Sequence, residues 1–383
     1  MQRKLSDNQA VIQLKMEADL LSEKCIACGL CQQECAFLQK YGSPKNIAGT
    51  YGPASTEDRS MAFECSLCQL CAAVCPVGLN PAALFLEMRR TAASRGTADF
   101  SCYHRILNYE RRGISRWYSS YALPEGCDTI LFPGCALAGT RPARVRQLYE
   151  HLLTTIPRLG LVLDCCTKPS HSLGREGYFR SVFSEMRDYL LQHGVRNVLV
   201  ACPSCYVVFQ QYGGGLQVKT VYEHLAANPL PVRARADATV TIHDPCSTRN
   251  ERHIHEAVRR LVVQSSLSIR EMRHHGPETL CCGEGGAVGY INPSLSKGWG
   301  EKRRQEAGGA RMITYCAGCA QLLGAGVIHI LDLLFAPEAS LAGRVKVAKP
   351  PWTSVNRLFL KRHFQKTIKA SISRVRTFTG DLD

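Results

Sequence analysis

The pattern of apolar positions divides the chain into a helical first part and a second part of alternating strands and helices. Residues 81–93 are rich in alanine, leucine, methionine and arginine, which favour helix, so we expect residues 1–120 to be mainly helical. From Asp128 onwards, short β-branched runs alternate with segments in which apolar residues recur at helical spacing, as Val145, Leu148 and Leu152 do. This alternation predicts an α/β architecture.

The strand-and-helix pattern occurs twice. Residues 129–132 and 197–200 read as buried strands that run into cysteine-bearing turns, and residues 240–242 and 311–315 repeat the pattern. Matching cysteines are separated by 111 residues (135 to 246), 116 residues (165 to 281) and 114 residues (202 to 316). Offsets this similar indicate an internal duplication.

Four segments follow from these patterns. We predict a mostly helical domain over residues 1–122, duplicated α/β domains over 123–235 and 236–340, and a basic tail over 341–383. No apolar run approaches the 18 residues or so that a membrane span needs, and residues 1–21 have no secretory signal. We therefore expect a cytoplasmic protein.

Cysteine usage points to metal chemistry. The chain has 383 residues, of which 20 are cysteines, and 45% are hydrophobic, enough for a sizeable core. In a reducing compartment, many thiols indicate metal or redox chemistry rather than disulfides. Composition therefore favours a metalloprotein.

The basic charge is unevenly distributed. The formal net charge is +15, and residues 346–383 carry nine lysines and arginines against two acids. No nucleic-acid-binding signature accompanies the charge, so we expect no nucleic acid partner. Within the tail, apolar residues such as Val355, Phe359 and Phe364 interleave with basic ones. Such a helix could lie on the anionic inner face of a membrane or dock an acidic partner; alternatively, it packs on its own domain.

Two cysteine runs of the first domain have the spacing of iron–sulfur ligands. In each run, three cysteines separated by two residues precede a fourth that, in two-cluster ferredoxins, ligates the other cluster. Zinc would not require a third cysteine at the same spacing. We predict two [4Fe–4S] cubanes, one held by Cys25, Cys28, Cys31 and Cys75 and the other by Cys65, Cys68, Cys71 and Cys35. The module resembles the helical ferredoxin module of respiratory iron–sulfur subunits.

Each α/β domain carries five further cysteines. The first cysteine set is Cys135, Cys165, Cys166, Cys202 and Cys205, and the second cysteine set is Cys246, Cys281, Cys282, Cys316 and Cys319. Adjacent cysteines do not easily cap two corners of one cube, so five thiolates suit a larger or distorted cluster.

Both sets resemble the CCG domain, which defines the catalytic subunit of heterodisulfide reductase. The domain recurs in iron–sulfur subunits of glycolate oxidase, lactate utilisation and anaerobic glycerol-3-phosphate dehydrogenase. The resemblance implies noncubane [4Fe–4S] clusters on the ten cysteines, and a substrate disulfide cleaved between them. The adjacent pairs Cys165–Cys166 and Cys281–Cys282 are then the predicted catalytic residues.

The first set departs from the family pattern. Thr167 stands where the family has glycine, whereas Gly283 follows the second pair. The cluster type at the first set is therefore open between noncubane and ordinary cubane, so we predict one or two noncubane clusters. The glycines that follow Cys282 are expected to let the backbone approach the cluster.

Several polar residues near the cysteines are candidates for lesser roles. Lys168, His171 and Glu284 could relay protons to a leaving thiolate. Arg141 and Arg249 could hold an anionic substrate group, but we expect both to be surface arginines. We expect the remaining candidates to be solvated histidines (His253, His255, His274 and His275) and buried thiols (Cys102 and Cys127).

Two hypotheses for function follow. In the first, the protein is a heterodisulfide-reductase-like iron–sulfur oxidoreductase that reduces or forms a disulfide. In the second, it is a non-catalytic electron-transfer subunit that links a flavoprotein dehydrogenase to a quinone or other carrier. Because no flavin or nicotinamide fingerprint occurs in the sequence, both hypotheses require a redox partner protein.

Overall fold

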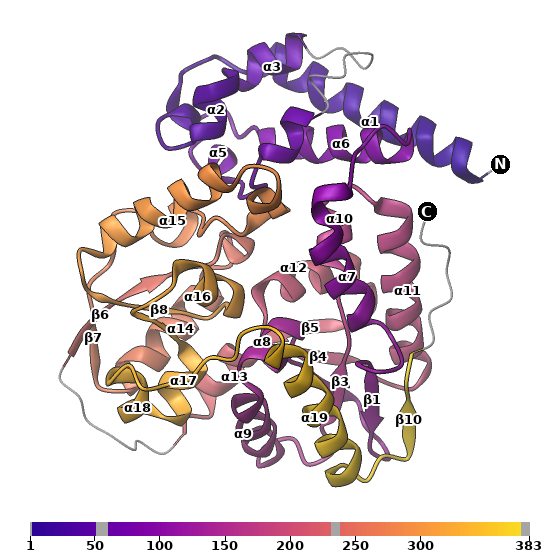
Figure 1. The fold of residues 1–383 in the computed structure, drawn as a ribbon, viewed down its shortest axis with the longest axis vertical. Helices are drawn as coiled ribbons and strands as arrows, with labels where there is room; N and C mark the ends of the chain where they lie inside the picture. Colours follow the sequence, from indigo (N-terminus) through magenta and orange to yellow (C-terminus); the bar gives the residue numbers. More distant parts are fainter. Residues whose placement is uncertain (1, 51–59, 231–237, 377–383) are drawn as a thin grey trace.

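The N-terminal domain is helical, as predicted. The computed structural model describes residues 2–50, 60–230 and 238–376. The helices of this domain are α1 (Gln2–Lys24), α2 (Ala36–Tyr41), α3 (Pro44–Thr50), α5 (Leu70–Ala73), α6 (Pro81–Ser94) and α7 (His104–Gly113). Leu14, Leu21, Phe37 and Phe85 form a core of their own between α1, α2 and α6. Helices α1, α2, α3, α5 and α6 lie across the top of the molecule, above both sheets, whereas α7 lies lower (Figure 1).

The first α/β domain is built on a mixed sheet of six strands. Its strand order is β10-β1-β3-β2-β4-β5, in which β3, β2, β4 and β5 are parallel. The strands in chain order are β1 (Ser120–Leu123), β2 (Thr129–Phe132), β3 (Gly160–Leu163), β4 (Asn197–Val200) and β5 (Gln217–Thr220). The helices are α8 (Cys135–Thr140), α9 (Pro142–Leu153), α10 (Lys168–Ser172), α11 (Glu176–Gln192), α12 (Pro203–Tyr212) and α13 (Val221–Ala227).

The second α/β domain repeats this arrangement with four parallel strands in the order β7-β6-β8-β9. The strands are β6 (Ala238–His243), β7 (Leu267–Ile269), β8 (Arg311–Thr314) and β9 (Val327–His329). The helices are α14 (Arg252–Gln264), α15 (Pro293–Ala307), α16 (Ala317–Leu323), α17 (Ile330–Phe335) and α18 (Pro337–Leu341). The order matches β3-β2-β4-β5 of the first sheet, so the duplication expected from cysteine spacing is visible in the topology. The predicted boundary at residues 235 and 236 lies outside the described residues.

The two α/β domains share one hydrophobic core. Ile130 and Val198 of the first sheet belong to the same buried cluster as Ile242 and Ile313 of the second. Their apolar runs are continuous rather than alternating because parallel strands are covered on both faces. Contact through a common core fixes the two domains relative to each other.

The C-terminal segment packs on the first α/β domain. Helix α19 (Trp352–Thr367) buries Leu360 and Phe364 in the shared core. Strand β10 (Ile372–Arg374) then pairs antiparallel with β1 at the edge of the first sheet, where both are seen beside α11 (Figure 1). The inner face of α19 therefore packs on the protein itself, which is one of the alternatives expected for this segment. Among the described residues, no helix is both long and apolar enough to cross a membrane.

Candidate metal centres

The two cysteine loops of the N-terminal domain bend in the same way. In each loop, the residues on either side of the middle cysteine have positive φ: Ala27 and Gly29 around Cys28, and Leu67 and Gln69 around Cys68. A non-glycine residue in this region costs about 1 kcal/mol, so the turns need a compensating gain. In the first loop, the turns leave Cys25, Cys28 and Cys31 lining one cavity together with Cys75.

The fourth cysteine of the first run lies close to the second loop. Cys35 packs with Cys68, and burial followed by the neighbouring Cys68 thiolate raises the pKa of Cys35 to about 11. Burial also raises the pKa of Cys65 to about 12, against the opposing charge of Arg89. Bound iron would supply the positive charge that these crowded thiolates need. The donor chemistry therefore fits an iron–sulfur cluster at each loop, and the ligand assignment itself stays a prediction.

The ten cysteines of the two sets follow the carboxyl ends of parallel strands. Cys202 and Cys316 occupy equivalent N-cap positions, at α12 after β4 and at α16 after β8. Cys205 and Cys319 lie within these two helices, and the remaining cysteines follow β2 and β3 in the first sheet and β6 and β7 in the second. Because the carboxyl ends of parallel strands meet at one edge of a sheet, each set converges there.

Within each set, the thiols contact one another. Cys205 lies 3.3 Å from Cys166, sulfur to sulfur, and Cys165 is hydrogen-bonded to Cys135. In the second set, hydrogen bonds link Cys281 to Cys246 and Cys282 to Cys319. A hydrogen bond from Cys205, and then its backbone N–H and that of Ser204, lower the pKa of Cys202 to about 7.

Two buried polar atoms beside the sets have no hydrogen-bond partner among the described residues. One is the hydroxyl oxygen of Thr167, whose φ of 52° keeps the left-handed conformation that Gly283 has after the second pair. The other is Nε2 of His243; an imidazole nitrogen of this residue lies within 4.8 Å of the thiols of Cys282 and Cys319. Arg303 donates to Nδ1 of His243 at 3.2 Å, which leaves the proton of the neutral ring on Nε2. Sulfur atoms of a bound cluster would satisfy both groups, so these residues fit such a cluster.

Two charged side chains lie near the sets. Glu284 is accessible to solvent, with a carboxylate oxygen within 4.8 Å of the thiols of Cys316 and Cys319. Desolvation by the surrounding protein, and then the thiolates of Cys282 and Cys202, raise its pKa to about 8. Burial lowers the pKa of Lys168 to about 8, opposed by the thiolates of Cys166 and Cys246. The charge of each side chain is therefore influenced by thiolates of both sets.

Hydrogen bonds join the two α/β domains around this region. The hydroxyl of Tyr222 donates to the carbonyls of Ala201 at 2.6 Å and Tyr315 at 2.8 Å, the residues that precede Cys202 and Cys316. The hydroxyl oxygens of Ser204 and Ser247 are 3.3 Å apart. Behind Lys168, the Nζ atom lies 3.2 Å from Nδ1 of His171, whose Nε2 is 2.9 Å from the hydroxyl of Tyr212.

One arginine that the sequence reasoning did not single out joins all three domains. Arg89 of α6 is fully buried and donates to carbonyls of the N-terminal domain (Ala62 and Cys65), the first α/β domain (Ser172) and the second (Gly286). An arginine within a helical segment carries no motif, so only these long-range contacts identify it.

The glycines after Cys282 allow close approach of a neighbouring loop as well as of a cysteine sulfur. A Cβ on Gly285 would lie 2.4 Å from the carbonyl oxygen of Ser66, and one on Gly286 would lie 2.4 Å from that of Cys65. These two glycines therefore admit the second loop of the N-terminal domain. Gly283 fits the expectation better, because its N–H donates to the sulfur of Cys281 at 3.3 Å.

The two arginines considered for substrate binding are buried rather than on the surface. Arg249 donates to the carbonyls of Cys68 at 3.0 Å and Thr279 at 2.7 Å, and so fastens the N-terminal domain to the second α/β domain. Arg141 pairs with Asp332 at 2.6 Å across the boundary between the α/β domains. The surface expectation is wrong for both, because their side chains are buried and hydrogen-bonded within the protein. The substrate-binding alternative stays a prediction.

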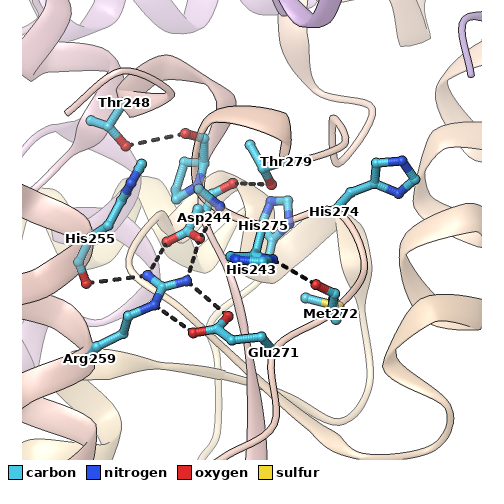
Figure 2. A network of polar contacts seen from close by, with 12 residues as sticks. His243, Asp244, Thr248, His255, Arg259, Glu271, Met272, His274, His275 and Thr279 are labelled. Atoms are coloured by element: carbon cyan, nitrogen blue, oxygen red, sulfur yellow. Dashed lines mark hydrogen bonds and ion pairs between the residues drawn. The ribbon is translucent and has the colours of Figure 1, made fainter. Parts of the chain in front are cut away.

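A polar network supports the turn before Cys246 (Figure 2). The carboxylate of Asp244 accepts from Arg259 at 2.9 Å and from the N–H of Gly276 at 2.8 Å, and Thr279 donates to its carbonyl. The prediction of solvated histidines is wrong for two of the four. His255 packs beside this network and His274 bonds to Glu306, and both are buried. His253 and His275 are exposed as expected, and of the two remaining cysteines Cys127 is buried whereas Cys102 is half-buried.

Comparison with known proteins agrees with this division. Residues 22–79 match the 4Fe-4S dicluster domain, and residues 129–210 and 240–324 each match the CCG cysteine-rich domain. One subunit of the fumarate reductase (CoM/CoB) of Methanothermobacter marburgensis is 24% identical over 357 residues, which cover 84% of this chain and 70% of the relative. One subunit of the dihydromethanophenazine:CoB–CoM heterodisulfide reductase of Methanosarcina barkeri is 21% identical, with 78% and 86% covered.

A third relative matches over a shorter region. The EtfAB:quinone oxidoreductase of Syntrophomonas wolfei is 24% identical over 263 residues, which cover 58% of this chain and 36% of the relative. The activities for which the three relatives are named differ from one another. The chain is thus an iron–sulfur electron-transfer protein that joins a 4Fe-4S dicluster domain to two CCG domains, with homologues among the heterodisulfide reductase subunits.

Proposed function

We propose that the two cysteine sets form one site for the interconversion of a disulfide and two thiols, and that electrons reach it through the N-terminal domain. The observation that carries the proposal is that the two sheet edges meet at the sets, where the hydroxyl of Tyr222 donates to the carbonyls of Ala201 and Tyr315, which precede Cys202 and Cys316. A disulfide bound between the sets would thus meet one set at each sulfur. The duplication supports this geometry, because it brings two equivalent sheet edges to a common region.

The clusters are assigned to four groups of ligands. Two cubanes would be held by Cys25, Cys28, Cys31 and Cys75 and by Cys65, Cys68, Cys71 and Cys35, and the two sets would hold further [4Fe–4S] clusters, noncubane at the second set. When bound, these clusters supply one-electron oxidation and reduction. The reaction consumes two electrons and two protons, breaks the S–S bond and yields two thiols.

The side chains near the sets supply charge and protons. The ammonium group of Lys168 can hold an anionic group of the substrate or protonate a leaving thiolate, and the carboxyl group of Glu284 can do the second. From Lys168, polar contacts lead through His171 to Tyr212, whose side chain is half-buried. A cationic and a carboxylic group near the sets suit a disulfide whose two halves differ.

The alternative is an electron-transfer subunit without a substrate of its own. The contact between Cys68 and Cys281 favours it as well, because it joins the N-terminal domain to the second set whether or not a substrate is reduced there. In both cases a redox partner protein, a flavoprotein or another carrier, supplies the electrons.

Spectroscopy distinguishes these functions. Protein purified and reconstituted without oxygen should bind about sixteen irons, four per ligand group, and saturation near eight would contradict clusters in the CCG domains. Addition of a thiol to the oxidised protein should create a new EPR signal if the sets react with sulfur substrates. Spectra indifferent to every thiol tried would favour the electron-transfer subunit.

We also propose that the outer face of α19 meets an anionic membrane. Trp117, Trp352 and Phe359 are 63%, 64% and 61% exposed. Arg111 and Arg112 line the same surface hollow as Trp117 and Leu358, and Arg362 and Lys366 are exposed on α19. Exposed tryptophan among arginines is typical of the membrane–water interface, and anionic lipids attract basic residues. This contact would leave the protein peripheral at the inner face of the membrane.

A further inference from the structure

The first cysteine set is completed by a residue from outside its CCG domain. We propose that the buried guanidinium of Arg357, on α19, raises the reduction potential of the cluster held by the first set. The inference rests on the proposed function only in that the first set must hold an iron–sulfur cluster. It concerns how this site differs from its duplicate.

The guanidinium of Arg357 lies near the sulfur of Cys165. Arg357 is 5% exposed. Its Nη2 and the sulfur of Cys165 lie 3.3 Å and 3.6 Å from the position that a Cβ on Gly113 would occupy. Such a Cβ would also lie 2.8 Å from the Cβ of Cys165, so α7 can approach the set only with glycine here.

Among the described residues, no acidic side chain forms an ion pair with Arg357, so its positive charge acts on the sulfurs. Its guanidinium carbon lies 5.2 Å from the ring centre of Tyr109 and 4.9 Å from that of Tyr118. No carboxylate pairs with it among the ion pairs of the described residues, whereas Arg141 pairs with Asp332. Burial acts against its charge, but the thiolates of Cys135 and Cys165 hold the pKa of Arg357 above its ordinary value. The negative charge that compensates this arginine is therefore that of the cysteine set.

Several contacts fix α19 in this position. Asn356 donates to the carbonyl of Gly139 on α8 at 2.9 Å, and Lys361 donates to the carbonyl of Arg116. After β10, Arg376 pairs with the buried carboxylate of Asp164, which directly precedes Cys165. The C-terminal segment thus holds the first set from two sides.

The second set has a different neighbour at the matching position. Cys281, which corresponds to Cys165 in the duplication, contacts Cys68 of the N-terminal domain. At the second set, electrons would enter on the side of Cys281 that contacts the N-terminal domain. At the first set, the matching side is covered by α7 and the cation of Arg357. Because a nearby positive charge favours the more negative, reduced state of a cluster, Arg357 makes the first set a better electron acceptor than it would be without this residue. Electrons that enter at the second set would then move on to the first.

Redox titration of the loaded full-length protein, followed by EPR, tests this inference. The first-set signal is identified as the one that Cys165→Ser removes. Arg357→Gln should shift that signal to lower potential and leave the N-terminal and second-set signals unchanged, whereas Arg357→Lys should restore most of the wild-type potential. Lys366→Met is the control, because it removes an exposed positive charge from the same helix away from the sulfurs; it should shift nothing.

The outcomes separate the inference from its premise. Wild-type protein without iron at the first set would contradict the proposed cluster there. First-set iron with the same potential in wild type and Arg357→Gln would overturn the role of Arg357 alone. Loss of first-set iron from both arginine variants would also overturn it, because the residue would then hold the set together rather than tune it.

Discussion

The side chains of Cys68 and Cys281 pack together across the boundary between the N-terminal domain and the second CCG domain. They pack with Leu70, Leu280 and Trp299 in one small apolar cluster. The contact brings a ligand of a ferredoxin-type cluster next to a ligand of the second set. Electron transfer between the two domains thus has a short path that depends on how the loop of Cys68 is docked.

The first prediction concerns this docking. Gly285→Ala would bring a Cβ to 2.4 Å from the carbonyl oxygen of Ser66, so the loop must move away from the second set. Overpacking of this kind costs about 1–3 kcal/mol, and we expect a loss of about 2 kcal/mol in the free energy of unfolding. Chemical denaturation under anaerobic conditions measures it.

Gly298→Ala in α15 is the matched control. A Cβ at Gly298 meets nothing within 4 Å, and alanine favours helix over glycine by about 1 kcal/mol. We therefore expect this variant to be as stable as the wild type or slightly more stable. Equal stability of the two alanine variants would contradict the docking role of Gly285.

Sequence reasoning succeeded where a pattern is local and failed where a contact is distant. The cysteine runs and the strand-to-cysteine turns lie within short segments, so the helical domain and the duplicated sheets were predictable. The role of Arg89 depends on Gly286, 197 residues away, and that of Arg249 on Cys68, 181 residues away. Nothing in the spacing of these residues identifies such pairs.

The C-terminal segment shows a second limit. Its helix has apolar residues on both faces: Leu360 and Phe364 are buried, whereas Trp352 and Phe359 are exposed. An amphipathic pattern identifies such a helix but not the partner of either face. The position of Arg357 beside the first cysteine set was therefore outside the reach of the pattern.

The second prediction concerns the pH dependence of stability. Burial, and then the charge of Arg141, lower the pKa of His329 from 6.5 to about 3. The folded protein therefore keeps this histidine neutral, while the unfolded chain binds a proton below pH 6.5. Stability is complete above pH 6.5 and falls with pH between 6.5 and 3, by up to about 1.4 kcal/mol per unit from this residue.

His329→Asn should remove that dependence. The side chain of His329 caps α17 by accepting from the N–H of Leu331 at 3.2 Å, a role that asparagine can keep without titrating. Between pH 7 and pH 5, the variant should lose about 2 kcal/mol less stability than the wild type. Urea denaturation of samples whose cluster absorbance is intact measures this difference. His253→Asn, at an exposed position, should behave like the wild type. Parallel pH profiles for all three proteins would contradict the assignment.

The third prediction tests the proposed membrane face. The protein should sediment with vesicles of phosphatidylcholine that contain phosphatidylserine, and much less with phosphatidylcholine alone, because the face combines arginines with exposed aromatic rings. Replacing both Trp117 and Phe359 with alanine should lower binding at least several-fold. Val263→Ala, which removes an exposed apolar side chain from the second CCG domain, should not. Equal binding of the double variant and the wild type would exclude this face.

The last prediction separates the two kinds of cluster site by mutation. Cys68→Ser should remove one ferredoxin-type cluster, about four irons, and slow the entry of electrons. The thiol-induced EPR signal of the oxidised protein should persist, because that signal arises at the cysteine sets. Cys282→Ser should do the reverse, since Cys282 contacts both Cys281 and Cys319 and so links the second set.

The second set is better suited to this comparison, because it keeps the Cys-Cys-Gly motif, whereas the first set has Cys-Cys-Thr. Retention of the signal in both variants would move the reacting site to the first set. In that case Cys166→Ser, which removes the thiol 3.3 Å from Cys205, should abolish it. A wild-type protein that never shows the signal would instead favour the electron-transfer subunit, because the sets would then carry electrons without taking on a substrate sulfur.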